Sequence, residues 1–214
     1  MGEDVTAADI RSWLAAFRDA VHEHGAYLTE LDSAIGDADH GSNLVRGMDA
    51  VMAAVDDESL APGELLKKAA TTLVSSVGGS SGPLYGTFFL RAAAAVGPAE
   101  TLDGAAVLEA LRAGVEGIVA RGHAEAGDKT MVDALAPAVE AYADALGGGA
   151  SAAEATAAAA SAAREGRDAT EPMQARKGRA SYLGERSIGH LDPGAASAAL
   201  LVGALADALA GQAA

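Results

Sequence analysis

The 214-residue sequence contains no cysteine, which excludes disulfide bonds, thiolate zinc sites and cysteine nucleophiles. Basic residues are also few: 15 Lys and Arg stand against 30 Asp and Glu, and the formal net charge is −15. An acid excess of this size opposes nucleic-acid binding, which needs a basic surface to displace counterions from phosphates. We therefore expect partners that are small molecules or other proteins, and no nucleic acid.

Long apolar segments are absent as well. The sequence has no run of the about 18 consecutive apolar residues from which a membrane-spanning helix is recognised. The N-terminus, Met1 to Asp4, contains two acids and no base, whereas a secretory signal begins with a basic segment. These features predict neither membrane insertion nor secretion, so we expect a cytoplasmic protein. The length suits one sizeable core and hence a single domain over residues 1–214.

Helical periodicity runs along almost the whole chain. Ile10, Leu14, Phe17 and Val21 fall three or four residues apart, as on one face of an amphipathic helix that begins after Thr6. Similar spacing predicts further helices near residues 44–55, 62–77, 84–96, 103–119, 130–147, 151–163 and 192–205. Period-two alternation between hairpin turns is absent, so the predicted fold class is all-α.

Residues typical of helix ends support these boundaries. Asp103 and Asp192 are expected N-caps, Pro62 and Pro193 suit a first turn, and the pairs Thr130–Asp133 and Ser151–Glu154 have capping-box spacing. Pro137 is expected to kink the sixth helix, and the glycines at 147–149 to end it. A low-complexity linker is the alternative for the Ala-rich stretch 152–163, but alanine is the best helix former and favours helix.

Glycine, serine and charged residues are concentrated at alternate junctions between these helices. The four junctions read DSAIGDADHGSN (32–43), SSVGGSSGPLYGT (75–87), GHAEAGDKT (122–130) and ARKGRASYLGERSIGHLDPG (175–194). Short links favour an antiparallel bundle, in which the junctions after helices one, three, five and seven lie at the same end. We therefore expect these four junctions to meet and to form a site there.

The first junction contains three carboxylates within eight residues. Gly36 can end the first helix and let the chain curl, so that Asp32, Asp37 and Asp39 converge. Clustered carboxylates repel one another unless a cation lies between them, and an all-oxygen ligand set suits Mg²⁺ or Ca²⁺. The spacing does not match an EF-hand. A solvated acidic helix end is the alternative, but Mg²⁺ with open positions for phosphate is the favoured interpretation.

The other junctions contain candidate phosphate-binding groups. The turn GGSSG (78–82) and the segment HGSN (40–43) both open a helix, where backbone N–H groups can approach an anion. The third junction only resembles a P-loop, because Asp128 separates Gly127 from Lys129 and no strand precedes it, so a Walker A site is rejected. Lys129 and Thr130 remain candidates for phosphate contact or for capping.

One basic cluster and one histidine are the remaining candidate site residues. The cluster comprises Arg176, Lys177, Arg179 and Arg186, and an arginine among them can neutralise a phosphoryl group in transfer. A solvated loop is the alternative. His40 adjoins the aspartates, whereas His22 and His24 are expected at the surface and Trp13, Phe88 and Phe89 in the core. The residues alone thus predict a magnesium-phosphate or magnesium-nucleotide site.

The motifs GDADHGSN, SSVGGSSGPLYGTFF, GDKTMVDAL and ARKGRASYLGERSIGHLDPGA together resemble the nucleotide-binding L subunit of bacterial dihydroxyacetone kinases and the matching domain of single-chain kinases. The resemblance implies an eight-helix barrel-like bundle with ADP and two Mg²⁺ at one end. It implies metal binding by Asp32, Asp37 and Asp39, and nucleotide binding by His40, Gly41, Ser42, Asn43, Ser80, Ser81, Gly122, Thr130, Met131, Arg179, Asp192, Pro193 and Gly194. Arg179 and the three aspartates would be catalytic. Ala38 departs from the glycine that relatives often have.

The implied activity is that of a phosphoenolpyruvate-glycerone phosphotransferase. In that system a phosphohistidine protein, the M subunit, converts bound ADP to ATP, and the L subunit passes the phosphoryl group to dihydroxyacetone on the K subunit. One alternative is an ATP-dependent kinase for dihydroxyacetone or another short keto-sugar; another is a nucleotide-bound sensor that binds a transcription regulator. The donor, the acceptor, a regulatory role and the oligomeric state, a homodimer included, stay open at this point.

Overall fold

The computed structural model describes residues 4–212, so the ends of the predicted domain, including most of the acidic N-terminus, lie outside the described residues. Its helices are α1 (Ala7–Ile35), α2 (His40–Ala54), α3 (Pro62–Ser76), α4 (Ser81–Val96), α5 (Gly104–Gly122), α6 (Val132–Gly147), α7 (Ala152–Ala169) and α8 (Pro193–Leu209). Two short 3₁₀ helices, η1 (Arg179–Ser187) and η2 (Ala210–Gln212), complete the helical elements. The all-α prediction is confirmed, and the Ala-rich stretch is the helix α7.

The helix starts follow the predicted caps. Thr6 caps α1 in a capping box with Asp9, the Asp103 carboxylate accepts the N–H of Ala106, and Ser151 and Glu154 cap α7 reciprocally. Pro62 and Pro193 occupy the first turns of α3 and α8. The start of α6 differs, because the Thr130 hydroxyl accepts the N–H of Val132 instead of that of Asp133. Pro137 lies within α6, and a kink there stays a prediction.

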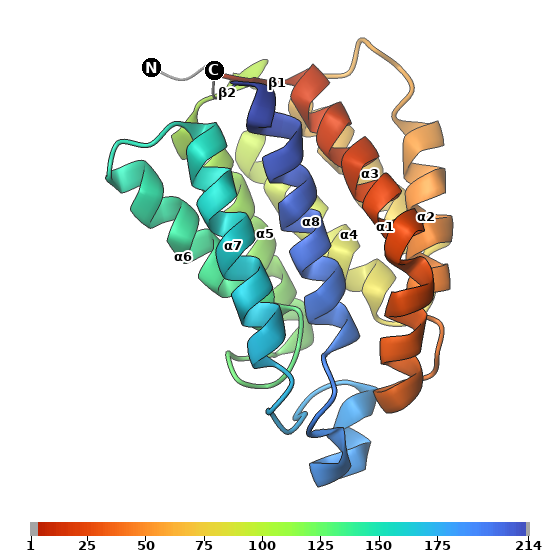
Figure 1. The fold of residues 1–214 in the computed structure, drawn as a ribbon. Coiled ribbons are helices and arrows are strands. Elements are labelled where there is room, and N and C mark those ends of the chain that lie inside the picture. Colours follow the sequence, from red (N-terminus) through yellow and green to blue (C-terminus); the bar gives the residue numbers. More distant parts are fainter. Residues whose placement is uncertain (1–3, 213–214) are drawn as a thin grey trace.

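Each helix packs against the next one in the sequence, and α8 also packs against α1, so the eight helices close into a ring. Figure 1 shows the neighbours running in opposite directions, with both termini at one end and the segment between α7 and α8 at the other. This is the predicted antiparallel, barrel-like bundle. Its consequence is that the links after α1, α3, α5 and α7 lie together at the end away from the termini.

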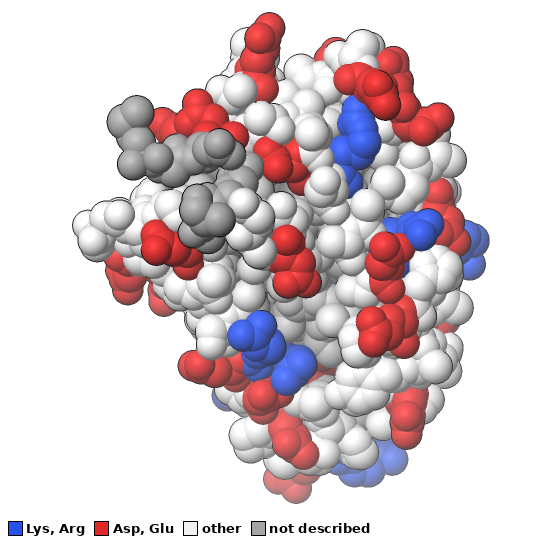
Figure 2. All heavy atoms as spheres, turned by 45° about the horizontal axis from the view of Figure 1, so that its top comes forward, with Lys and Arg blue, Asp and Glu red and all other residues white. Residues whose placement is uncertain are grey.

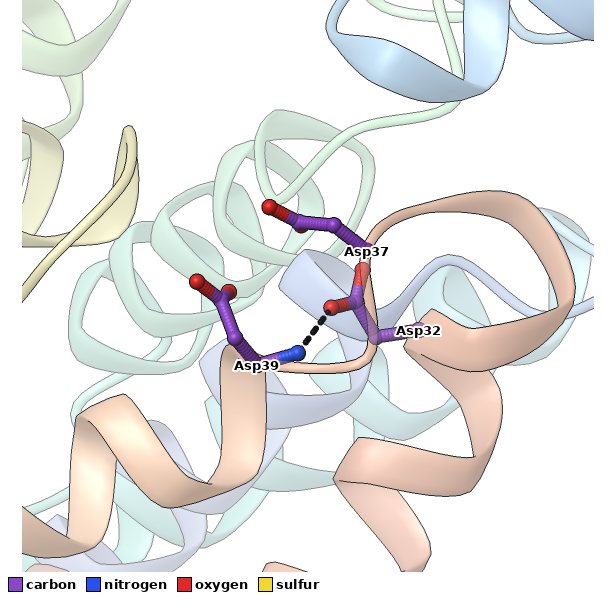
Figure 3. A group of neighbouring side chains, drawn as sticks. All are labelled: Asp32, Asp37 and Asp39. Carbon is purple, nitrogen blue, oxygen red and sulfur yellow. Dashed lines mark hydrogen bonds between the residues drawn. The ribbon is translucent and has the colours of Figure 1, made fainter.

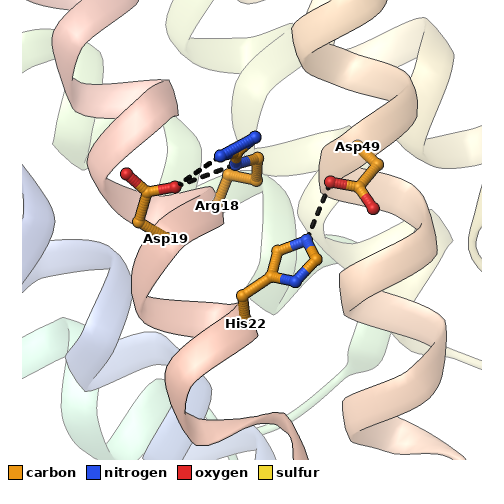
Figure 4. Close-up of polar contacts among 4 residues, drawn as sticks. All are labelled: Arg18, Asp19, His22 and Asp49. Carbon is orange, nitrogen blue, oxygen red and sulfur yellow. Dashed lines mark hydrogen bonds and ion pairs between the residues drawn. The ribbon is translucent and has the colours of Figure 1, made fainter.

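The core fills the ring with the predicted apolar faces. The side chains of Leu14, Phe17 and Val21 are fully buried, and the Trp13 and Phe89 rings lie 5.6 Å apart inside the ring. His22, in contrast, is exposed and bonds Asp49 of α2 at 2.8 Å (Figure 4). The predicted division between core aromatic residues and surface histidine is therefore confirmed at these positions.

A short strand pair and a 3₁₀ helix were not predicted. Val5–Thr6 (β1) and Thr101–Leu102 (β2) form a two-residue antiparallel ladder beside the bundle, too short for a period-two pattern to reveal. The fourth junction, expected to be irregular, contains η1, which is interrupted at Gly184 with φ of 58°. Left-handed backbone at Gly178 and Gly184 breaks the segment into short turns, and glycine adopts this conformation without steric cost.

Among the described helices, none is long and apolar enough to cross a membrane. Figure 2 shows the face nearer the termini, where Asp and Glu are spread over the whole surface and Lys and Arg occur in small groups between them. The acid excess of the sequence is thus visible on this face as a broadly distributed negative charge.

Candidate functional site

A cavity of about 360 Å³ opens at the end of the bundle away from the termini. Its lining comes from all four polar junctions and from the helix ends that they join: residues 32–40, 79–85, 118–132 and 177–194 each contribute. Because links after alternate helices of an antiparallel ring lie at the same end, residues as far apart in the sequence as Asp32 and Gly194 line one cavity. The structure therefore brings together the junctions that the sequence singled out.

The three aspartates of the first junction lie at this cavity (Figure 3). One carboxylate oxygen from each of Asp32, Asp37 and Asp39 lies within 4.8 Å of the others. Helix α1 ends at Gly36, where a side chain would collide with the carboxylate of Asp32, and Ala38 then turns the chain back with φ of 60°. The predicted curl after the helix is what makes the carboxylates converge.

The cluster has the chemistry of a divalent-cation site. Asp32 is buried and accepts the backbone N–H groups of Asp39 and His40 at 2.9 and 3.2 Å, whereas Asp37 and Asp39 are more exposed. Hard oxygen donors held by a helix end and a tight turn, with an open side toward a cavity, fit Mg²⁺ that keeps positions for water and phosphate. The donor set therefore fits the metal that the sequence predicted.

Arg179 of η1 reaches across to this cluster. Its Nη2 atom lies 2.9 Å from Oδ2 of Asp37, and both side chains are partly exposed to solvent. A pair in this position is screened and contributes less than about 1 kcal/mol to stability. Its importance is geometric, because it places a guanidinium, which can bind phosphate through several N–H groups, beside the carboxylates.

Ser80 and Ser81, at the start of helix α4, also line the cavity. The N–H groups of a first helical turn have no acceptor within their own helix. Gly79, with φ of 66°, leads into the turn, and the Ser80 side chain makes no capping bond. The turn can therefore present backbone donors and hydroxyl groups to an anion, as the sequence predicted.

A buried polar chain holds His40 in place. Its Nδ1 and Nε2 atoms lie 3.0 Å from Oγ of Ser81 and 2.8 Å from Oγ of Ser197, and Ser197 also bonds the Tyr85 hydroxyl at 2.7 Å. Burial lowers the pKa of His40 and raises the pKa of Tyr85. The chain thus ties together the starts of α2, α4 and α8. Sequence reasoning missed Tyr85 and Ser197; the available signal was a serine in the apolar face of α8.

The third junction supplies Gly122, Thr130 and Met131 to the cavity wall. Asp133 shapes the turn, because its carboxylate accepts the N–H groups of Gly127 at 2.5 Å and of Thr130 at 2.7 Å. Lys129 also lines the cavity, but its side chain is only 1% exposed and its ammonium bonds the backbone carbonyls of Met173 and Ser187. Its phosphate contact stays a prediction.

The fourth junction closes the cavity with Arg179, Asp192, Pro193 and Gly194. The Asp192 carboxylate caps α8 by accepting the N–H of Ala195 at 2.7 Å. Burial raises the pKa of Asp192 to about 7, the backbone bond to Ala195 opposing this shift. Of the remaining basic cluster, Lys177 lines the cavity, whereas Arg176 and Arg186 are exposed and lie outside its lining.

Three predicted nucleotide contacts lie outside the cavity lining, in the first turn of α2. A side chain at Gly41 would approach the carbonyl oxygen of Gly25 within 2.0 Å, so glycine is required here for the packing of α2 on α1. Ser42 is exposed, and its hydroxyl donates to the carbonyl of Asp39. Asn43 is buried and accepts a bond from Arg46 at 2.5 Å. Their nucleotide contacts stay predictions.

Comparison with known proteins gives this site its context. A family profile described as "DAK2 domain" matches residues 34–207. The sequence is 45% identical, over 94% of this chain and 97% of the relative, to the PEP-dependent dihydroxyacetone kinase, ADP-binding subunit DhaL, of Escherichia coli. It is also 45% identical, over 90% and 92% of the two chains, to the corresponding subunit of kinase 1 from Listeria innocua.

A solved structure shares the fold. The dihydroxyacetone kinase from C. freundii, in complex with AMP-PNP and Mg²⁺, matches with a TM-score of 0.71 and 25% sequence identity. The match covers 97% of this chain but 35% of that one, so the chain spans about a third of the length of that kinase. The profile match over most of the chain and the full-length relatives agree, and the chain belongs to the DAK2 domain family, together with the DhaL subunits of dihydroxyacetone kinases.

Proposed function

We propose that this chain is the ADP-binding L subunit of a PEP-dependent dihydroxyacetone kinase. The observation that carries the proposal is the convergence of Asp32, Asp37 and Asp39 at a cavity that the Ser80–Ser81 helix start also lines. Carboxylates for Mg²⁺ and backbone donors for phosphate, brought to one cavity, are two components that a phosphoryl-transfer site requires. The names of the E. coli and L. innocua relatives support the same function.

The residues have distinct roles in this proposal. Asp32, Asp37 and Asp39 hold two Mg²⁺, whose chemistry is to offset the negative charge of the phosphates. The helix start at Ser80 and Ser81 donates to the phosphate oxygens, with Ser81 oriented by His40. Gly122, Thr130, Met131, Asp192, Pro193 and Gly194, together with the first turn of α2, enclose the nucleoside.

Arg179 completes the proposed catalytic arrangement. ADP held in the cavity would supply the β-phosphate oxygen that accepts a phosphoryl group from the phosphohistidine of an M subunit, and the group would then pass to dihydroxyacetone on a K subunit. Arg179 lies where a guanidinium stabilises charge on the group in transfer, and its partial exposure places it at the mouth through which both partners approach. The chain itself contributes positioning and charge, which are the main components of phosphoryl-transfer catalysis.

Retained nucleotide tests the proposal directly. The protein is purified with Mg²⁺, dialysed extensively and denatured, and the released nucleotide is identified by chromatography and mass spectrometry. We expect about one ADP per chain, since a coenzyme that is phosphorylated in place must stay bound between turnovers. An empty protein that binds and releases added ATP would instead indicate the ATP-dependent kinase, and binding of neither would contradict a nucleotide site.

A pair of variants assigns the result to the aspartate cluster. Asp37→Asn keeps the size of the side chain but removes a charged metal ligand, so the retained ADP should fall well below one per chain. Asp56→Asn makes the same change at an exposed aspartate outside the cavity and should leave retention unchanged. Equal retention by both variants would count against the proposed metal ligands.

A further inference from the structure

Lys129 is a buried ammonium between two junctions of the site. Its side chain is 1% exposed, and its Nζ atom donates to the carbonyl oxygens of Ser187 at 2.7 Å, Met173 at 3.0 Å and Glu171 at 3.4 Å. Glu171 and Met173 follow the end of α7, whereas Ser187 ends η1. One side chain therefore bonds both the beginning and the later part of the segment between α7 and α8.

This placement has an energetic cost that the carbonyls offset. Burial lowers the pKa of Lys129, because the charged form loses water, and three carbonyl oxygens replace that water with charge-assisted hydrogen bonds. The backbone at Lys129 is also left-handed, with φ of 63°, which a residue with a side chain adopts at a cost of about 1 kcal/mol or more. Strain and burial together at one residue indicate a specific structural task.

The segment between α7 and α8, which Lys129 bonds at both ends, contains Arg179 and places it beside the aspartate cluster. Further bonds hold its base together, since the Ser187 hydroxyl accepts the N–H of Ala175 at 2.9 Å and the N–H of Gly189 donates to Glu171 at 2.8 Å. The segment also rests on the end of α1 through a small apolar cluster of Ile35, Ala175, Ala180 and Leu183. In Figure 1 this segment is the light-blue loop and short helix at the lower end of the bundle.

We propose that Lys129 is a positioning residue for phosphoryl transfer. By bonding both ends of the segment between α7 and α8, it holds the Arg179 guanidinium at the aspartate cluster. This inference rests on the proposed function. It predicts that loss of the ammonium acts mainly on the rate of transfer through Arg179. A direct phosphate contact by Lys129 would instead weaken nucleotide binding and would act whether or not Arg179 is present.

A double-mutant cycle separates these possibilities. Lys129→Met, Arg179→Gln and the double variant are assayed for dihydroxyacetone phosphate formation with the K and M subunits of the E. coli enzyme, with the present chain limiting. Lys129→Met should lower kcat by about 100-fold, as a misplaced catalytic group does, while the Kd for Mg·ADP changes by less than about threefold. In the Arg179→Gln background the same change should lower kcat by less than about threefold, because the group that it positions is already absent.

The controls identify which hypothesis fails. Lys67→Met removes an exposed lysine of α3 outside the cavity and should keep the wild-type rate. An equal loss from Lys129→Met in both backgrounds would overturn the positioning role. A wild-type rate for Arg179→Gln would instead contradict the proposed function of the site.

Amide hydrogen exchange gives a second, structural measurement. The exchange rate should rise in residues 171–190 of Lys129→Met. A uniform rise over all helices, or a variant that does not fold, would also overturn the inference.

Chemical rescue tests the charge itself, and the absence of cysteine from the chain makes it specific. Lys129→Cys is unfolded, alkylated with 2-bromoethylamine and refolded, which restores an ammonium at nearly the length of lysine. Alkylation with iodoacetamide adds a neutral group as the matched control. The aminoethylated protein should recover most of kcat and the neutral adduct should not. Equal recovery by the two adducts, or recovery by neither, would contradict a role for the ammonium.

Discussion

Ala38 lies between two of the clustered aspartates in a left-handed conformation, with φ of 60°. This conformation brings Asp39 back onto Asp32, but a residue with a β-carbon adopts it at a cost of about 1 to 2 kcal/mol. The site therefore contains a small local strain that can be measured.

Replacing Ala38 by glycine should stabilise the protein. Relief of the left-handed strain exceeds the added entropy of glycine in the unfolded chain, so we expect a gain of about 0.5 to 1 kcal/mol in the free energy of unfolding. Urea denaturation in EDTA measures it. Ala157→Gly, at an exposed position within α7, should cost about 1 kcal/mol. A loss of equal size at both positions would show that Ala38 is not strained.

Asp192 should make stability depend on pH. Its pKa is raised to about 7 by burial, so the folded state keeps a proton that the unfolded carboxyl loses near pH 4. The stabilising contribution of the protonated group is therefore full below about pH 4 and is lost as the pH rises through about 7. Asp192→Asn keeps an oxygen for the N–H of Ala195 but cannot ionise.

The test compares the two proteins at two pH values. Relative to the wild type, Asp192→Asn should gain about 1 to 3 kcal/mol in the free energy of unfolding between pH 4.5 and pH 8.5. Urea denaturation of both proteins in EDTA gives the difference directly, because titrations shared by the two proteins cancel. A difference that stays constant over this range would show that Asp192 ionises normally in the folded protein.

Single residues also mark the limit of prediction from sequence. The Asp32, Asp37 and Asp39 cluster was predictable, because its members lie within eight residues and share one chemistry. Tyr85 and Ser197 were not, since their contact joins residues 112 positions apart and neither residue type is distinctive alone. Lys129 was noticed for its charge, but its use depends on carbonyls 42 to 58 positions away.

At the level of elements, the helices were predictable and the segment between α7 and α8 was not. A helix repeats its pattern over several turns and is capped by nearby residues, as at Thr6 and Ser151, so its information is local. The segment with η1 has short turns held by Lys129, the α1 end and its own hydroxyl groups. Its conformation follows from tertiary contacts, which periodicity does not record.

Two glycines within helices should respond in opposite ways to alanine. A side chain at Gly41 would collide with the Gly25 carbonyl of α1, so Gly41→Ala should cost about 2 to 3 kcal/mol by forcing α1 and α2 apart. Gly203 of α8 has open space, and Gly203→Ala should gain about 0.5 to 1 kcal/mol from helix propensity. Thermal and urea unfolding measure both. Equal effects would mean that propensity, not helix contact, decides at Gly41.

At the level of the whole molecule, the net charge of −15 opposes the compact state, and the three aspartates concentrate part of it at one cavity. Two responses to ions follow. Monovalent salt screens charge everywhere, whereas Mg²⁺ at the proposed site acts on the aspartate cluster. The two effects can be separated, because screening depends on ionic strength and site binding on the individual carboxylates.

The melting temperature Tm should therefore rise in two steps, first with NaCl and then with Mg²⁺. NaCl raised from about 0.02 to 0.5 M should increase Tm by about 2 to 4 °C through screening of the acid excess. At equal ionic strength, Mg²⁺ at about ten times its Kd should add about 1.4 kcal/mol, or about 3 to 6 °C. Asp37→Asn should keep the first rise and lose the second, while Asp56→Asn keeps both. A magnesium effect that survives undiminished in Asp37→Asn would place the ion elsewhere on this acidic surface, since loss of a charged ligand weakens the binding of a cation at the cluster.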